Sequence, residues 1–219
     1  MKRFFLILAL FPLLAGCGER YSWHQKLVLE VETPNGAVKG GSVVAMTMHW
    51  PEGWQRFGGV NGVDSDMRGE ASFVEVAPGR YLFALIGWNS YELALRVYED
   101  GSRDPRETAE RLSRLKETRP MPRHMWPTLV TFADIDRPNT VRRVDPDSLA
   151  AGFGHGYRLK SVTLEITDEP VTRGEVKKVL PWLREYYDRM FDGNRYQTIR
   201  AGAPVASSLA AGDFDTERD

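Results

Sequence analysis

Cysteine is nearly absent from this chain: Cys17 is the single cysteine among 219 residues. One cysteine cannot form an intrachain disulfide, so the folded part must be stabilised by a buried core. The chain is long enough for such a core, because a protein of this size buries roughly 70% of its unfolded surface. Six Trp, ten Phe and eight Tyr supply the apolar bulk, and we expect one globular domain, with two small domains that share an interface as the alternative.

An excess of charge of either sign is also missing. The chain carries 29 Lys and Arg against 30 Asp and Glu, a formal net charge of −1, and has no block of like charge. Binding to nucleic acid relies on a dense basic face. We therefore expect no nucleic-acid partner.

Local motifs of catalysis and metal binding are missing as well. The sequence contains no HExxH, no G-x-S-x-G and no GK[ST]. None of the four histidines (His24, His49, His124 and His155) stands four residues from another on a helix. We therefore predict neither a metal site nor a cofactor.

Two short patterns have both a functional and a structural interpretation. Asp134 and Asp136 could hold a divalent cation with a third acid, but such a pair also forms an Asx-turn, which we favour. The closely spaced glycines Gly152, Gly154 and Gly156 resemble a phosphate-binding loop. A strand rather than a helix follows these glycines, so we interpret them as a helix stop and a turn.

Long apolar runs are absent too, and the longest one lies at the start of the chain. Residues 4–14 are apolar and follow the basic Lys2 and Arg3. This run is well short of the roughly 20 residues that span a bilayer as a helix. It has the length and flanks of a signal peptide.

The four residues that end this region, LAGC from Leu14 to Cys17, resemble the lipobox of bacterial lipoproteins. The resemblance implies that residues 1–16 are removed and that Cys17 carries a diacylglycerol and often a further acyl chain. Two or three acyl chains anchor a protein firmly to a membrane. Gly18, where an Asp would indicate inner-membrane retention, slightly favours the outer membrane. The alternatives are a secreted protein with a free thiol and an uncleaved anchor.

The rest of the chain predicts an α+β fold. We expect a short tether at 17–24, a single α+β domain at 25–192 and a disordered tail at 193–219, which is small and polar. The domain divides into a β-rich part (25–87) and a mixed part (88–192) with several short helices. The β-rich part is an antiparallel sheet, for which one layer of a sandwich is one interpretation.

Particular residues support these elements. Leu27, Leu29 and Val31 alternate with polar residues as in a half-buried strand, and the turn signal at 34–36 follows. Asp104 before Pro105 predicts a capped helix. Tyr21 and Trp23 either rest among lipid headgroups or start the fold; we favour the second. Further capping boxes are predicted from two residue pairs, Asp104 with Glu107 and Thr172 with Glu175.

A second resemblance covers about residues 25–185. The segments VTFADIDRPNTVRRVDPDSLAAGFG and LKSVTLEITDEPVTRGEVKKVLPWL are similar to an uncharacterised family of proteobacterial lipoproteins. This family implies no activity that could be carried over.

The loop at 50–69 is the candidate contact surface. It is longer than an ordinary hairpin loop and contains Trp50, Trp54, Arg56 and Phe57, residues that suit a sugar, a peptide or a protein partner. The alternative is that Trp50 and Trp54 turn inward and cover one end of the sheet.

Two functions follow as hypotheses. The first is a non-catalytic lipoprotein on the periplasmic side of a bacterial membrane that binds an envelope protein or a cell-wall component. The alternative is an envelope hydrolase acting on peptidoglycan or glycan, with Asp134, Asp136, His124 and Glu165 brought together by the fold.

Overall fold

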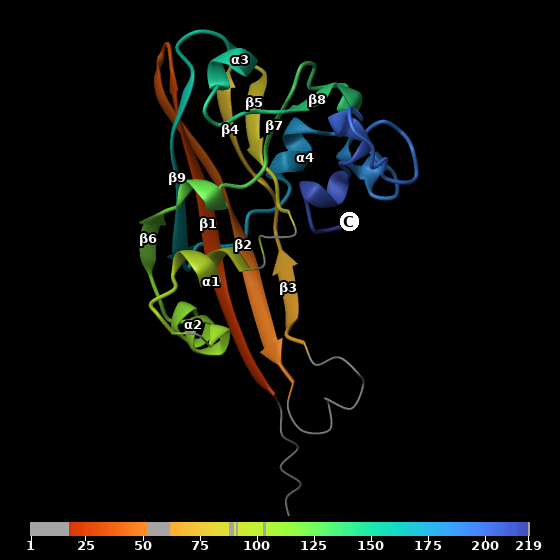
Figure 1. Cartoon of the computed structure of the whole chain (residues 1–219). Coiled ribbons are helices and arrows are strands. Elements are labelled where there is room, and N and C mark those ends of the chain that lie inside the picture. Colours follow the sequence, from red (N-terminus) through yellow and green to blue (C-terminus); the bar gives the residue numbers. More distant parts are fainter. Residues whose placement is uncertain (1–17, 52–61, 88–89, 91, 103, 219) are drawn as a thin grey trace, which may run out of the picture.

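The protein is an α+β fold built on two antiparallel sheets, which confirms the predicted fold class (Figure 1). The structure, a computed structural model, describes residues 18–51, 62–87, 90, 92–102 and 104–218. The α-helices in this part are short: α1 Leu93–Val97, α2 Pro105–Leu112, α3 Leu149–Phe153 and α4 Glu175–Val179. None of the helices within those ranges has the length and apolar character to cross a membrane.

The larger sheet has five strands in the order β3-β2-β1-β9-β6. The long β1–β2 hairpin forms its centre, and its two-residue turn, Pro34–Asn35, was predicted from the sequence. Gly36 after the turn has φ 114°, a conformation that favours glycine. The strand bounds are β1 Glu19–Thr33, β2 Gly36–Trp50, β3 Asp64–Arg68, β6 Glu117–Pro120 and β9 Arg158–Thr167.

The predicted tether at 17–24 is wrong from Glu19 onward, because β1 already begins there. Residues 19–24 pair with β2 along its last six residues. Trp23 is buried, and its indole N–H donates to Gln25 Oε1 at 3.0 Å. The alternative, that Tyr21 and Trp23 start the fold, is the one that the structure shows.

The smaller sheet has four strands in the order β4-β5-β7-β8. Its strands are β4 Ser72–Ala77, β5 Arg80–Ala84, β7 Leu129–Phe132 and β8 Val141–Arg143. On β5, Leu82 and Ala84 pack in the same apolar cluster as β1 and β2, whereas Phe83 packs in a second cluster with the C-terminal region. Because successive strand side chains point to opposite faces, this sheet is the middle layer of three.

The two sheets approach most closely where β2 crosses β4. A Cβ atom on Gly40 would overlap the carbonyl oxygen of Phe73 and lie 2.9 Å from the Cα of Val74. Beside it, the backbone N–H of Ser42 donates to Ser72 Oγ at 2.9 Å, and the Ser42 hydroxyl donates to Ala71 O at 3.0 Å. Glycine at this position therefore permits the contact, and buried hydroxyls hydrogen-bond across it.

The predicted disordered tail at 193–219 is wrong over residues 193–218. Phe214 is fully buried, and it lies 5.5 Å from the rings of both Phe83 and Phe191. Backbone bonds also tie the segment to the β3–β4 connection: Ala71 N donates to Phe214 O (2.8 Å), and Thr216 N donates to Gly69 O (3.0 Å). A few large apolar residues and these backbone bonds order a segment that is small and polar on average.

The start of α4 is capped by a distant carboxylate. Glu70, which is 1% exposed, accepts from the backbone N–H of Glu175 (3.1 Å) and of Val176 (3.2 Å). The predicted local capping box is therefore wrong, and the Thr172 hydroxyl instead accepts from Val43 N at 2.9 Å. The cap ties α4 to the β3–β4 connection and so to the two sheets.

Helix α2 has the cap that the sequence predicts. Asp104 Oδ1 accepts from Arg106 N at 2.9 Å, and Pro105 occupies the first turn. Glu107 does not complete a capping box with Asp104, because its carboxylate accepts from the Ser102 hydroxyl at 2.6 Å.

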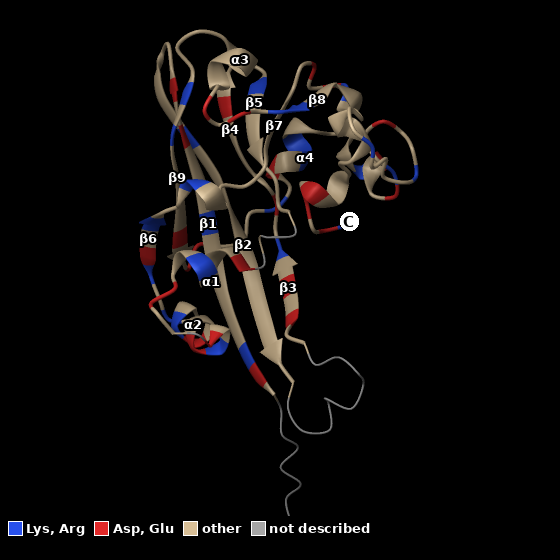
Figure 2. Ribbon diagram, in the orientation of Figure 1, with Lys and Arg blue, Asp and Glu red and all other residues tan. Residues whose placement is uncertain are grey.

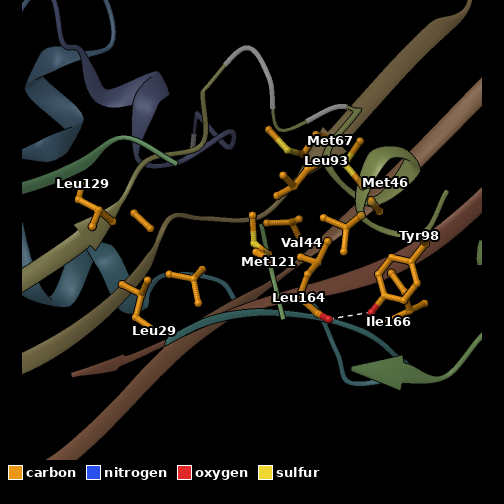
Figure 3. Packing of buried hydrophobic residues seen from close by; sticks show 14 of the residues in the cluster. Leu29, Val44, Met46, Met67, Leu93, Tyr98, Met121, Leu129, Leu164 and Ile166 are labelled. Carbon is orange, nitrogen blue, oxygen red and sulfur yellow. Dashed lines mark hydrogen bonds between the residues drawn. The ribbon is translucent and has the colours of Figure 1, made fainter. Parts of the chain in front are cut away.

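Tyr98 fixes the end of α1 to the larger sheet. Its ring is fully buried in the main cluster, and its hydroxyl donates to the carbonyl oxygen of Leu164 on β9 at 2.7 Å (Figure 3). Burial raises the pKa of this hydroxyl to about 12. Helix α1 is thereby held over the sheet, where it forms part of the cleft described next.

Candidate functional site

A cleft of about 410 Å³ lies where the two apolar clusters meet. Its walls come from five parts of the chain: Leu85, Gly87 and Ser90 after β5, helix α1, residues 124–128 before β7, the end of β8, and the C-terminal region. The volume is in the usual range for small-ligand sites. Because residues from separated elements form it, only the tertiary fold creates this cleft.

Two cationic or titratable side chains at the rim have no protein partner in the part of the chain that the structure describes. Arg143, at the end of β8, and His124, in the 3-10 turn at 123–125, line the cleft without a hydrogen bond or ion pair to any described residue. Arg96 of α1 lines it too, but its guanidinium bonds Glu92 at 2.6 Å. Figure 2 shows basic residues on both α1 and β8. The rim can therefore bind an anionic group.

One acidic side chain belongs to the same cleft. Asp213, partly buried, accepts from Ala210 N at 2.8 Å through Oδ2, whereas Oδ1 bonds none of the described residues. Burial raises the pKa of the Asp213 carboxyl above its ordinary value, and the Ala210 N–H opposes that shift. The free oxygen can accept a hydrogen bond from a ligand.

The apolar side of the cleft is made by aliphatic residues and one indole ring. Leu93 and Leu209 are buried there. Trp126 is held in place because its Nε1–H donates to Met121 O at 2.9 Å and the Arg123 guanidinium lies 4.0 Å from its ring centroid. A flat or aliphatic ligand group could pack against this wall.

A small cavity of about 30 Å³ adjoins the cleft on the side of the larger sheet. The two share Leu85, Ser90, Leu93 and Pro127, and the small cavity reaches the buried Glu70. A cavity of this size can hold ordered water beside polar groups. The carboxylate that caps α4 is therefore close to this side of the cleft.

A second depression, of about 320 Å³, lies on β1, β2 and β3 and has a less favourable lining for a charged ligand. Four of its five charged or titratable side chains, all but Arg20, already face each other: His49 Nδ1 is 3.7 Å from Asp64 Oδ2, and Arg68 Nε is 3.0 Å from Asp66 Oδ2. A ligand would have to compete with these pairs. The cleft between the clusters is therefore the stronger candidate.

Of the predicted contact residues, the structure places Trp50 alone. Its ring is 7% exposed at the end of β2, with Tyr21 at 6.0 Å and the Arg106 guanidinium 5.9 Å from the ring centroid. Trp50 thus turns inward, as the alternative interpretation has it. The other three residues, Trp54, Arg56 and Phe57, lie outside the described residues.

The four residues of the hydrolase hypothesis lie in three separate parts of the chain. Asp134 Oδ1 accepts from Asp136 N at 3.1 Å in the turn after β7, which is the Asx-turn favoured from the sequence. Glu165 lies on β9, where its backbone is opposite Lys26 of β1 in the strand register. Of these, only His124 lines the cleft. In the described ranges no three His, Cys, Asp or Glu side chains form a group that could hold a metal ion.

The glycines at 152–156 have the structural role that the sequence favours. Gly154 ends α3 with φ 106°, and Gly156 makes the turn into β9 with φ 88°.

Sequence reasoning missed most of the residues that form the cleft. Trp126 stands in a proline-rich connection, and Arg143 is one of two arginines on a short strand. Asp213 lies in the segment predicted to be disordered. The one available signal was His124 and Trp126 close together in a connection that is rich in proline and so restricted in conformation.

The lining thus combines an arginine and a histidine without partners among the described residues, one acceptor and an apolar wall, which suits a small ligand that has both a charged and an apolar part. Comparisons of the chain with models of protein families, with curated proteins and with solved structures found no match.

Proposed function

We propose that this chain is a lipid-anchored protein on the periplasmic side of a bacterial membrane and that it binds an envelope component in the cleft between its two apolar clusters. The outer membrane is slightly favoured, because Gly18 follows Cys17. The anchor part of the proposal comes from the lipobox resemblance. The binding part is carried by one observation: Arg143 and His124 line a cleft without partners among the described residues.

The start of β1 determines how far the domain would lie from a lipid on Cys17. The strand begins at Glu19, so one residue, Gly18, separates it from the cysteine. At about 3.3 Å per extended residue, this link spans less than about 10 Å. A lipid on Cys17 would therefore hold the folded domain directly against the membrane surface.

Binding is a better-supported proposal than hydrolysis. A hydrolase needs an acid, a base or a nucleophile held in one pocket, and of the four residues considered for it only His124 lines the cleft. Asp213 lines it too, but one of its oxygens already accepts from Ala210 N. The charged groups that do line the cleft suit recognition of an anion.

Replacement of the anchoring cysteine tests membrane attachment. Cells would express the full chain or Cys17→Ser and would be labelled with radioactive palmitate before fractionation. We expect the wild-type chain to take up label and to sediment with membranes until detergent is added. Cys17→Ser should do neither, and Asn35→Ser, a change in the exposed hairpin turn, should behave as the wild type. If Cys17→Ser still sediments with membranes to the same extent, the anchor proposal is wrong.

The loop that contains Trp54 remains a second proposed contact surface. A pull-down from detergent-solubilised membranes, with the wild type and with Trp54→Ala, tests its contribution. Loss of a reproducible envelope partner in the variant would support the loop. An unchanged set of partners would contradict it.

A further inference from the structure

We infer that the cleft binds the free carboxyl end of a short peptide, with the terminal carboxylate at Arg143 and His124 and the last side chain against Trp126 and Leu209. This inference rests on the proposed function as an envelope binding domain and names its ligand class. Each part of such a ligand has a matching group in the cleft.

The terminal carboxylate matches the two rim side chains. Arg143 and His124 line the cleft and are free of hydrogen bonds and ion pairs to the described residues. A guanidinium is planar and can donate two parallel hydrogen bonds to a carboxylate. An imidazole can donate a further bond from one ring nitrogen. The rim can therefore hold the carboxylate without first breaking an internal ion pair.

The peptide backbone matches the acidic group. Asp213 uses Oδ2 to accept from Ala210 N, and Oδ1 has no partner in the described part of the chain. A peptide N–H next to the terminal carboxylate can donate to that oxygen. The same carboxylate repels a ligand with several negative charges, so a nucleotide or a polyphosphate fits the cleft less well.

The apolar wall matches a side chain. Leu93 and Leu209 are buried at the cleft, and Trp126 is fixed by its bond to Met121 O. A prearranged wall of this kind favours binding, because little side-chain entropy is lost when the ligand packs. A free amino acid would reach the rim but would use less of the 410 Å³ volume than a short peptide.

A pair of probes that differ in one group tests the carboxylate. The full chain, purified from membranes in detergent, would be titrated by calorimetry with N-acetyl-Leu-Ala and with N-acetyl-Leu-Ala amide. We expect the acid to bind and the amide to bind at least about tenfold more weakly, since a hydrogen bond to a charged group contributes that much. If acid and amide both bind measurably and with equal affinity, the inference is overturned; if neither binds, titration with the D-form decides.

Neighbouring residues provide matched control variants. Arg143→Gln should weaken binding of the acid by at least about tenfold, whereas Arg142→Gln should leave it unchanged, because Arg142 does not line the cleft and donates to Gly152 O instead. His124→Gln should weaken binding, and His155→Gln, at an exposed position outside the cleft, should not. Equal losses in the paired variants would contradict the proposed site.

The peptide could be the end of a protein or part of the cell wall, and the chirality of its last residues distinguishes these two sources. Protein termini end in L-residues, whereas cell-wall peptides end in D-residues, so the titration is repeated with N-acetyl-D-Leu-D-Ala. Tighter binding of either form supports the inference and identifies the source, and failure of both forms overturns it. If both fail while membrane attachment still depends on Cys17, the anchor proposal stands and the peptide inference alone is wrong.

Discussion

Gly40 is the residue on which the packing of the two sheets depends most directly. Any side chain at this position would enter the backbone of β4, where Phe73 O and Val74 Cα lie. Backbone cannot move aside as the end of a flexible side chain can, so a larger residue must push the two sheets apart.

We predict that Gly40→Ala destabilises the protein by about 1–3 kcal/mol or more. Urea unfolding followed by tryptophan fluorescence measures this change. Gly152→Ala is the control: no atom lies within 4 Å of a Cβ placed there, and the residue is in helix α3. The control should be neutral or slightly stabilising, and equal effects of the two variants would contradict the proposed crossing.

Titration of Glu70 lowers the stability of the folded protein as pH rises. Burial raises the pKa of its carboxyl above the ordinary value of 4.5, the charges of Asp215 and Glu175 add to this, and the Val176 and Glu175 N–H groups oppose it. The folded protein therefore holds this proton more tightly than the unfolded chain. The contribution of Glu70 to stability is present below its unfolded pKa and is lost as pH rises through the folded pKa.

Glu70→Gln removes this titration. The unfolding free energy of the variant minus that of the wild type should become more positive as pH rises above the unfolded pKa of Glu70 and through its raised folded pKa. Urea unfolding at several pH values measures the difference. Glu99→Gln, a change at an exposed position, should show a much smaller trend. A difference that falls with pH would contradict the assignment.

At the scale of elements, the C-terminal segment is a structural part of the domain. Its residues cover the outer face of the smaller sheet, and it also supplies Leu209 and Asp213 to the cleft. Residues 214–216 pair with residues 69–71 like a short additional strand. The segment should therefore unfold together with the sheets.

We predict that Phe214→Ala costs about 3–5 kcal/mol, the usual range for a buried Phe replaced by Ala. Ile199→Ala, in the same segment but 88% exposed, should change stability by less than about 0.5 kcal/mol. Thermal and urea unfolding measure both variants. A Phe214→Ala protein as stable as Ile199→Ala would mean that the segment is not packed as described.

At the scale of the whole molecule, β1 connects the proposed membrane end with the opposite end. Its 15 residues extend over roughly 50 Å, from Glu19, close to the proposed anchor Cys17, to the hairpin turn at Pro34–Asn35 (Figure 1). The proposed anchor thus predicts which end of the protein faces the lipid.

Single labels can measure this orientation, because a lipidated Cys17 leaves no other cysteine in the chain. We predict that a fluorophore on Arg20→Cys is quenched by spin-labelled lipids when the lipidated protein is bound to vesicles. The same fluorophore on Asn35→Cys should be quenched much less, because it lies at the far end of β1. Equal quenching at both positions would contradict an upright arrangement.

The sequence by itself determined the elements whose signals are local. The alternation of Leu27, Leu29 and Val31, the turn at 34–36 and the Asp104–Pro105 helix start depend on neighbouring residues, and the structure confirms them. The lipobox is a local signal as well, and it stays a prediction that the fractionation experiment tests.

Only the tertiary structure decided the features that join residues far apart in the chain. Glu70 caps a helix that begins 105 residues later, and Phe214 is ordered because a sheet face is available to bury it. The cleft likewise needs Trp126, Arg143 and Asp213 from three separate segments. Such contacts leave no periodic pattern in the sequence, because their free energy depends on partners that the fold alone brings together.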